Sequence, residues 1–276
     1  MAYLIPELFP FELSEWQQKA VIAIENGDNC LVTAPTGSGK TVPAEFAIAY
    51  FNQLEHPKKV IYTAPIKALS NQKYYEFQKK FPHISFGILT GDIKDNPDAD
   101  VLIMTTEILR NNLHNLETSD SSSSMQLDFN IDIQNELGCV IFDEVHYIND
   151  LDRGTVWEES FMLLPSHVQL TMLSATIARP KCFAKWIESI HKKDDNCKKV
   201  VLCDSNLRNV PLKHYLWFCC SPQMVHKKIN DPTMIDKISA VTNQLVPIYT
   251  DHFHDDSYHK LNKVRRFLDM NKLYVK

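Results

Sequence analysis

The sequence lacks paired cysteines, an N-terminal leader and an excess of positive charge. Its seven cysteines include no Cys-x-x-Cys pair, which argues against a zinc site of that kind and fits a reducing compartment. No basic segment precedes the apolar residues at the N-terminus, which excludes a signal peptide. The net charge of −5 argues against a chain that coats nucleic acid through bulk electrostatics, although a local basic track stays compatible with it.

The sequence also lacks a membrane span. Residues 160–178 carry no formal charge, but they contain Pro165, His167 and Gln169, which a helix facing lipid tolerates poorly. Hydrophobic residues make up 44% of the chain and charged residues 23%, which is an ordinary globular mixture. We therefore expect a soluble, intracellular protein with a well-formed core and no membrane partner.

Short apolar segments alternate with longer helical patterns over the first three quarters of the chain. The predicted strands are 29–34, 59–64, 85–89, 101–104, 139–142, 169–173 and 199–203. The predicted helices between them are 14–26, 40–52, 67–80, 107–114, 155–163 and 180–191. This alternation predicts an α/β fold in which helices sandwich a parallel sheet.

The alternation stops after residue 203, so we predict a first domain at 1–204 and a linker or accessory extension at 205–276. The extension is too short for a second α/β domain and is expected to hold a strand at 212–220 and a helix at 255–273. Residues 117–126 include four consecutive serines and are predicted to form a surface loop.

A phosphate-binding loop is predicted at residues 34–41, APTGSGKT, between a strand and a helix. Gly37 and Gly39 let the backbone bend so that N–H groups converge on phosphate oxygens, and the helix start adds its positive dipole end. Lys40 would reach the β- and γ-phosphates of ATP, and Thr41 would ligate Mg²⁺. The predicted ATP-binding residues of the loop are Pro35, Thr36, Gly37, Ser38, Gly39, Lys40 and Thr41.

Two adjacent carboxylates follow the apolar strand at 139–142, in the segment CVIFDEVH. Ligands of parallel sheets bind beyond the carboxyl ends of the strands, where the phosphate loop also lies. Asp143 is predicted to hold Mg²⁺ and Glu144 to orient and deprotonate the attacking water, with His146 completing the catalytic set. Adjacent carboxylates are costly to bury without a cation, which also favours a metal ion.

Two further segments are expected at the same site. Gln17 carries a paired donor and acceptor suited to the adenine edge, and Phe11 could stack on the adenine ring, although it could also pack the start of a helix. The triplet Ser174, Ala175 and Thr176 ends the next strand, where it is predicted to hydrogen-bond His146 and couple the nucleotide state to the rest of the motor.

Taken in order, these motifs resemble those of superfamily-two DExH-box helicases. The set comprises Phe11 and Gln17, APTGSGKT, APIKALSNQ at 64–72, TGD at 90–92, TTEILR at 105–110, FDEVHYIND at 142–150 and SAT. The stretch FDEVHYINDLDRGTVWEE at 142–159 resembles the superkiller and exosome-associated RNA helicases, as does VPLKHYLW at 210–217. The resemblance implies a RecA-like P-loop NTPase domain that uses ATP and Mg²⁺ to move 3′ to 5′ on RNA.

The same resemblance implies a track for the backbone of single-stranded or partly duplex RNA. Its residues would lie at strand ends and helix starts, where backbone N–H groups and hydroxyls meet phosphates. They are Pro65, Lys67, Ala68, Gly91, Thr106 and Glu107.

The sequence shows no second set of strands and no QxxGRxGR-like segment. We therefore expect the chain to lack the second RecA-like domain that completes the ATP site, as a cut motor or a stand-alone regulatory domain, with weak activity by itself. That domain and an RNA-decay complex are the expected partners. A DExH DNA helicase and a non-catalytic RNA-binding protein that kept the fold remain as alternatives, although intact Lys40, Asp143 and Glu144 count against the second.

Overall fold

The computed structural model describes residues 8–118, 131–190, 198–205, 214–217 and 245–248. The chain divides into two compact units, Met1–Asn209 and Val210–Lys276. None of the helices in the described segments is long and apolar enough to cross a membrane.

An eight-stranded sheet forms the centre of the first unit, in the order β4-β3-β5-β2-β6-β7-β1-β8. All neighbouring strands run parallel except β4, which pairs antiparallel with β3. The strands are β1 Asn29–Thr33, β2 Lys59–Ala64, β3 Phe86–Leu89, β4 Lys94–Asp95, β5 Val101–Thr105, β6 Leu137–Phe142, β7 Gln169–Ser174 and β8 Val200–Asp204. The prediction of a parallel sheet is thus confirmed.

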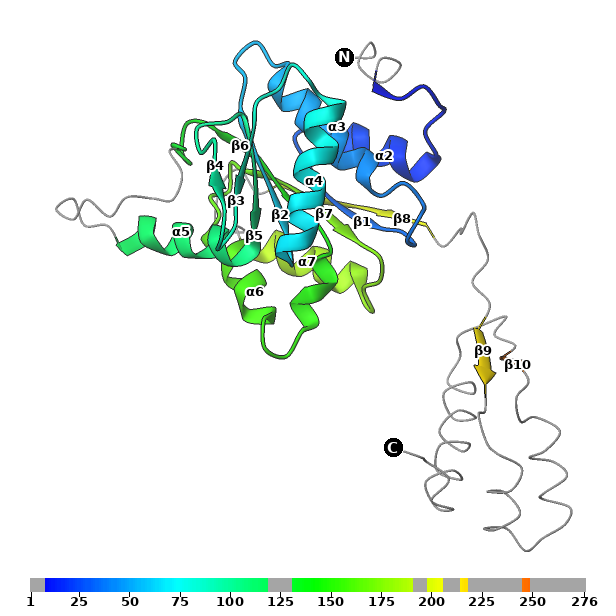
Figure 1. The fold of residues 1–276 in the computed structure, drawn as a ribbon. Helices are drawn as coiled ribbons and strands as arrows, with labels where there is room; N and C mark the ends of the chain where they lie inside the picture. Colours follow the sequence, from blue (N-terminus) through cyan, green and yellow to red (C-terminus); the bar gives the residue numbers. More distant parts are fainter. Residues whose placement is uncertain (1–7, 119–130, 191–197, 206–213, 218–244, 249–276) are drawn as a thin grey trace, which may run out of the picture. The chain divides into compact units, whose positions relative to one another are not determined.

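Helices cover both faces of this sheet (Figure 1). They are α2 Glu15–Glu25, α3 Thr41–Asn52, α4 Lys67–Lys80, α5 Thr106–Thr118, α6 Gly154–Leu163 and α7 Pro180–Ile190. Side chains of α2, α3 and α4 pack with one face of the sheet in one core cluster, and those of α5, α6 and α7 pack with the other face in a second cluster.

The strands are buried on both sides because apolar side chains project from both faces of the sheet and pack against the helices. Every residue of β5 and β7 is buried, and so is every residue of β6 except Gly138. Such continuous apolar strands are typical of a parallel sheet with helices on both sides. The arrangement brings the carboxyl ends of β1, β2, β5, β6 and β7 to one edge of the sheet, which is where the predicted motifs stand.

Most predicted elements begin and end within two residues of their limits in the structure, but one helix is longer and two short elements were not predicted. The helix predicted at 107–114 is longer and spans Thr106–Thr118, so the predicted loop at 117–126 begins inside it; residues 119–130 lie outside the described part. The two-residue strand β4 was not predicted because only its pairing with β3 defines it. A 3₁₀-helix, η1 Val145–Asn149, follows the DEVH carboxylates and was also missed.

The second unit contains a two-stranded antiparallel sheet of β9, His214–Trp217, and β10, Leu245–Ile248. The strand predicted at 212–220 is therefore confirmed over four of its residues. The helix predicted at 255–273 lies outside the described residues. The predicted domain limits, 1–204 and 205–276, stay a prediction.

Candidate functional site

The loop between β1 and α3 is bent tightly at the edge of the sheet. Ser38 donates from its backbone N–H and its hydroxyl to the carbonyl of Pro35, at 3.2 and 2.7 Å. Gly37 and Gly39 have φ angles of +79° and +86°, in the left-handed region that side chains with a Cβ rarely adopt. The glycine spacing of the sequence therefore corresponds to a bend that these two positions make possible.

Gln17, on α2, binds this loop through its side-chain amide. Its side-chain nitrogen donates to the carbonyl of Gly39 at 3.2 Å, and its oxygen accepts from the N–H and the hydroxyl of Ser14, both at 2.9 Å. A Cβ on Gly39 would lie 2.8 Å from the Gln17 side-chain nitrogen. Gln17 is buried, so most of its hydrogen-bonding capacity fixes the loop against α2 in this structure.

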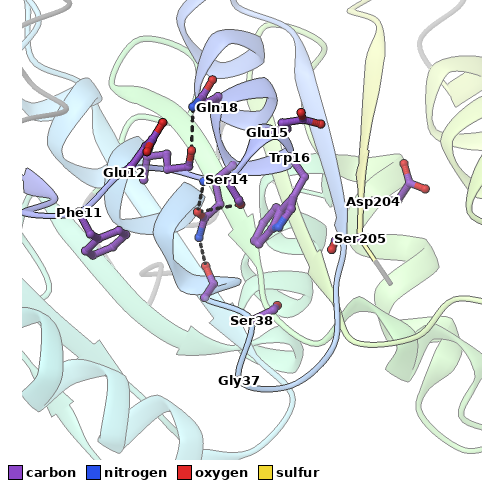
Figure 2. Close-up of a pocket in the computed structure, with 13 residues that line it drawn as sticks. Phe11, Glu12, Ser14, Glu15, Trp16, Gln18, Gly37, Ser38, Asp204 and Ser205 are labelled. Atoms are coloured by element: carbon purple, nitrogen blue, oxygen red, sulfur yellow. Dashed lines mark hydrogen bonds between the residues drawn. The ribbon is translucent and has the colours of Figure 1, made fainter. Parts of the chain in front are cut away.

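A cavity of about 1000 Å³ lies between the start of α2 and the phosphate loop, which is ample for a nucleotide. Its lining includes Phe11, Trp16, Gly37, Gly39 and Asp204. In Figure 2 the rings of Phe11 and Trp16 come from the two sides of Ser14, above the turn of the loop. Phe11 is 53% exposed, so its ring is available to a ligand and does not serve to fill the core.

The DEVH carboxylates stand where β6 ends. Glu144 has a φ of +56°, an uncommon left-handed conformation for a residue with a side chain, which turns the chain from β6 into η1. Its N–H donates to Asp143 Oδ1 at 2.9 Å, and its carbonyl accepts from the N–H of Tyr147 at 3.0 Å. Such a conformation costs of order 1–3 kcal/mol, and residues held in it cluster at active sites.

Asp143 has a partner that the sequence did not reveal. The hydroxyl of Tyr62, on the neighbouring strand β2, donates to Asp143 Oδ2 at 2.5 Å, and both side chains are buried. Burial raises the pKa of Tyr62 well above its ordinary value, and the adjacent Asp143 carboxylate raises it further. Tyr62 therefore stays a hydrogen-bond donor at neutral pH and fixes the orientation of Asp143.

The charged groups of the two motifs lie together. Lys40 Nζ is 3.7 Å from Glu144 Oε1, and His146 Nδ1 is 3.2 Å from Glu144 Oε2. The His146–Glu144 pair lacks hydrogen-bond geometry, and neither of its two atoms hydrogen-bonds elsewhere in the described residues. The structure thus brings together Lys40, Asp143, Glu144 and His146, as the sequence predicts.

The residues of this site fit a magnesium ion. Each oxygen of Asp143 accepts one hydrogen bond, from Tyr62 or from Glu144, which leaves further lone pairs on a buried carboxylate. Hard cations such as Mg²⁺ prefer oxygen ligands of this kind. Asp143 and the hydroxyl of Thr41, at the first residue of α3, are the groups that would hold it.

The Ser-Ala-Thr triplet lies at the same edge of the sheet. The carbonyl of Ser174 accepts from the N–H of Ala34 at 3.1 Å. Its buried hydroxyl makes no hydrogen bond within the described part of the chain, and neither does His146 Nδ1. The hydrogen bond predicted between the triplet and His146 is therefore not formed among the described residues. Ala175 and Thr176 instead share with His146 the wall of a second cavity, of about 770 Å³.

The predicted RNA residues follow three neighbouring strands, β2, β5 and β3. Pro65 and Thr106 are buried, whereas Lys67, Ala68 and Gly91 are exposed. Lys67 Nζ pairs with Asp92 Oδ2 at 2.6 Å and would lie 3.2 Å from a Cβ on Gly91. Glu107, in the first turn of α5, pairs with Arg153, which the sequence did not single out.

The DEAD/DEAH box helicase family matches residues 14–182, the part of the chain that carries Gln17, the phosphate loop, the DEVH segment and the SAT triplet. The chain belongs to this family. The fold and the resemblance predicted from the motifs are thereby confirmed.

Proteins similar to this chain include helicases of the superkiller and exosome-associated type. Antiviral helicase SKI2 of Saccharomyces cerevisiae is 44% identical over 209 residues, which cover 76% of this chain and 15% of that protein. Superkiller complex protein 2 of Homo sapiens is 43% identical over 217 residues, covering 78% and 16%. Exosome RNA helicase MTR4 of Mus musculus is 42% identical over 209 residues, covering 76% and 18%. The chain therefore spans less than a fifth of each of these relatives.

The fold is also similar to that of a solved helicase. The DUF1998 helicase MrfA, bound to DNA and AMPPNP, aligns with a TM-score of 0.55 and 20% identity over 71% of this chain and 27% of that one. At this identity the likeness supports the helicase fold of the chain.

Two residues of the site were missed by sequence reasoning, Tyr62 and Arg153. Tyr62 lies in an apolar strand, where a tyrosine is expected to fill the core. Arg153 lies in a polar segment next to Asp152, where an arginine is expected to face solvent. Both residues were missed because their partners are distant in the sequence: Tyr62 and Asp143 are 81 residues apart, and Arg153 and Pro65 are 88 apart.

Proposed function

We propose that this chain is the nucleotide-binding motor domain of an ATP-dependent RNA helicase. The observation that carries the proposal is the meeting of Lys40 from the phosphate loop with Glu144 of the DEVH segment, 3.7 Å apart and beside the buried Asp143. This is the arrangement that ATP hydrolysis needs, because one group must neutralise phosphate charge while another activates water.

The roles of the groups follow from their chemistry. The Lys40 ammonium would neutralise the β- and γ-phosphates, and the N–H groups of the loop and of the start of α3 would bind their oxygens. Glu144 would orient the attacking water and accept its proton. A Mg²⁺ ion held by Asp143 and Thr41 would supply further neutralisation of the phosphate charge. Phe11 would stack on the base; its ring lines the cavity and is 53% exposed, which supports this role.

The RNA strand would follow the ends of β2, β5 and β3, beside Pro65, Lys67, Ala68, Gly91, Thr106 and Glu107. The relatives named as RNA helicases support RNA as the nucleic acid. We further propose that a second RecA-like domain of the full-length protein supplies arginine fingers to the ATP site. Ser174, Ala175 and Thr176 would couple closure of the two domains to the bound nucleotide. The protein would move 3′ to 5′ along RNA and act in an RNA-decay complex.

The test is ATP turnover by this chain with and without single-stranded RNA, beside its Glu144→Gln variant and together with ADP binding. We expect ADP to bind but turnover to stay low, because arginine fingers contribute about 10³–10⁵ in rate. In the full-length protein, RNA should stimulate turnover, and Glu144→Gln should abolish turnover while ATP still binds.

Three results would each contradict a part of the proposal. Failure of the chain to bind ADP would remove its nucleotide-binding role. Stronger stimulation of the full-length protein by DNA than by RNA of the same sequence would replace RNA by DNA as the substrate. Fast, RNA-stimulated turnover by this chain alone would keep the ATPase but overturn the need for a second domain.

A further inference from the structure

Arg153 joins three segments at the edge of the sheet. Its Nε donates to Glu107 Oε1 at 2.8 Å, and its Nη2 donates to the same oxygen and to the carbonyl of Pro65. The planar guanidinium makes this possible because its donors point in fixed, divergent directions. A lysine at this position would carry the charge but could not hold both partners in the same geometry.

The loop before α6 is built to place this arginine. Asp150 Oδ1 accepts from the N–H groups of Asp152 and Arg153 at 3.1 and 3.0 Å, and the Asp150 carbonyl accepts from the N–H of Gly154 at 2.9 Å. A Cβ on Gly154 would lie only 2.4 Å from the carbonyl oxygen of Ile148. The close turn therefore requires glycine directly after Arg153. This turn fixes the position of the Arg153 backbone and so the point from which the Arg153 side chain extends.

The bridge connects the DEVH strand with the two strands next to it. Pro65 follows β2, Glu107 follows β5, and Arg153 follows β6 through η1. The order β5-β2-β6 means that Arg153 reaches past the end of β2 to the end of β5. Pro65 and Glu107 are residues that the resemblance places along RNA, whereas η1 begins directly after Glu144 of the ATP site.

Glu107 is an unsuitable ligand for a phosphate, because two negative groups repel each other at short range. Its pairing with Arg153 gives the carboxylate a different task. It anchors the arginine and, through it, keeps the start of α5 at a fixed spacing from Pro65. With the carboxylate engaged in this way, a phosphate would meet the backbone N–H groups at the start of α5 in place of the Glu107 side chain.

We infer that Arg153 is a positioning residue for the RNA strand, holding the segments at Pro65 and Glu107 in register without itself touching the RNA. The inference rests on the proposed RNA binding and goes beyond it, since it assigns the geometry of the RNA track to a residue of the 142–159 stretch that was given no role of its own above.

The first experiment measures binding of a fluorescein-labelled oligouridylate to the chain by fluorescence anisotropy at low salt. Arg153→Gln should weaken RNA binding between about threefold and thirtyfold, the range typical of residues that couple distant segments, and leave ADP binding unchanged. The matched control is Arg110→Gln, which breaks another arginine–glutamate pair between α5 and α6, with Glu159 at 3.1 Å. RNA affinity that falls equally in both variants, or in neither, would overturn the inference.

Salt dependence separates positioning from direct contact. If Arg153 does not touch phosphate, Arg153→Gln keeps the slope of log affinity against log salt, whereas loss of one phosphate contact lowers its magnitude by about 0.7 on single strands. The double variant Arg153→Gln/Glu107→Gln should bind RNA as weakly as Arg153→Gln. Recovery of normal affinity in the double variant would show that Arg153 only neutralises Glu107.

A measurement without RNA keeps the inference testable on its own. Amide hydrogen exchange in the segments 66–70 and 106–109 should become faster in Arg153→Gln than in the wild type or Arg110→Gln, because both segments lose a shared anchor. Unchanged exchange would refute the positioning role whether or not RNA binds. Faster exchange in a chain that binds no RNA would retain the anchor but refute the proposed RNA track.

Discussion

Removal of the Tyr62 hydroxyl tests how the magnesium carboxylate is held. In Tyr62→Phe, Asp143 Oδ2 loses a 2.5 Å hydrogen bond in a site where both side chains are buried. Hydrogen bonds to charged groups contribute about 1.5–3 kcal/mol, so the free energy of unfolding should fall by about 2 kcal/mol. Loss of such a supporting bond typically lowers metal affinity by about 10- to 100-fold.

The assay has two parts. Urea unfolding, followed by tryptophan fluorescence, gives the change in the free energy of unfolding. ADP titrations in Mg²⁺ and in EDTA give the gain in affinity that the metal provides, which should shrink in Tyr62→Phe while the affinity in EDTA stays the same. The control is Tyr74→Phe, which removes a 2.8 Å tyrosine–aspartate bond to Asp95, outside the nucleotide site.

The pH dependence follows from the raised pKa of Tyr62, which burial and the Asp143 carboxylate both cause. Below pH 10 the tyrosine is protonated in the folded and the unfolded chain, so its stabilisation is fully present. Above pH 10 the unfolded chain releases this proton and the folded chain keeps it, so the stabilisation is lost. The stability difference between wild type and Tyr62→Phe should therefore shrink above pH 10, by up to about 1.4 kcal/mol per pH unit.

A Tyr62→Phe variant that unfolds at the same urea concentration as the wild type and gains as much ADP affinity from Mg²⁺ would refute the supporting role of Tyr62. An equal loss of metal dependence in Tyr74→Phe would point to a general loosening of the core instead of a local effect on Asp143.

Further substitutions test the phosphate loop and the base site. Lys40→Ala should weaken ADP and ATP binding about tenfold or more in titrations, since it removes a charged contact to phosphate; unchanged affinities would exclude that role. Gly39→Ala should lower the free energy of unfolding by about 1–2 kcal/mol and displace Gln17, whereas Gly37→Ala, with nothing within 4 Å of its Cβ, carries the backbone cost alone. Phe11→Ala should weaken ADP binding but leave the urea midpoint in place, because the ring is 53% exposed.

Much of the fold could be predicted because local patterns define the elements. The helix predicted at 67–80 and the strand predicted at 59–64 have the same limits in the structure, since apolar periodicity and the break before residue 67 are local signals. The elements that were missed have no such signal. Strand β4 is only Lys94–Asp95 and exists through pairing with β3, and η1 depends on the left-handed backbone of Glu144.

The nucleotide site was predictable for a related reason. Glycine spacing in the loop and the adjacent carboxylates after β6 are contiguous in sequence, and parallel strands bring their carboxyl ends to one edge. Gln17 was predicted to bind the adenine edge, but the sequence does not show that its amide already hydrogen-bonds Ser14 and the carbonyl of Gly39. Likewise, the hydrogen bond expected between the Ser-Ala-Thr triplet and His146 required a separation and orientation that the triplet alone does not determine.

The sequence by itself determined the parallel sheet between helices, the phosphate loop and the DEVH carboxylates, because each depends on residues close together in the chain. Only the tertiary structure decided which side chains support them. Tyr62 meets Asp143 because β2 pairs with β6 in one particular register, and Arg153 meets Pro65 and Glu107 because β2 lies between β5 and β6. The order and register of the strands arise from packing of the whole domain, so no local pattern encodes these contacts.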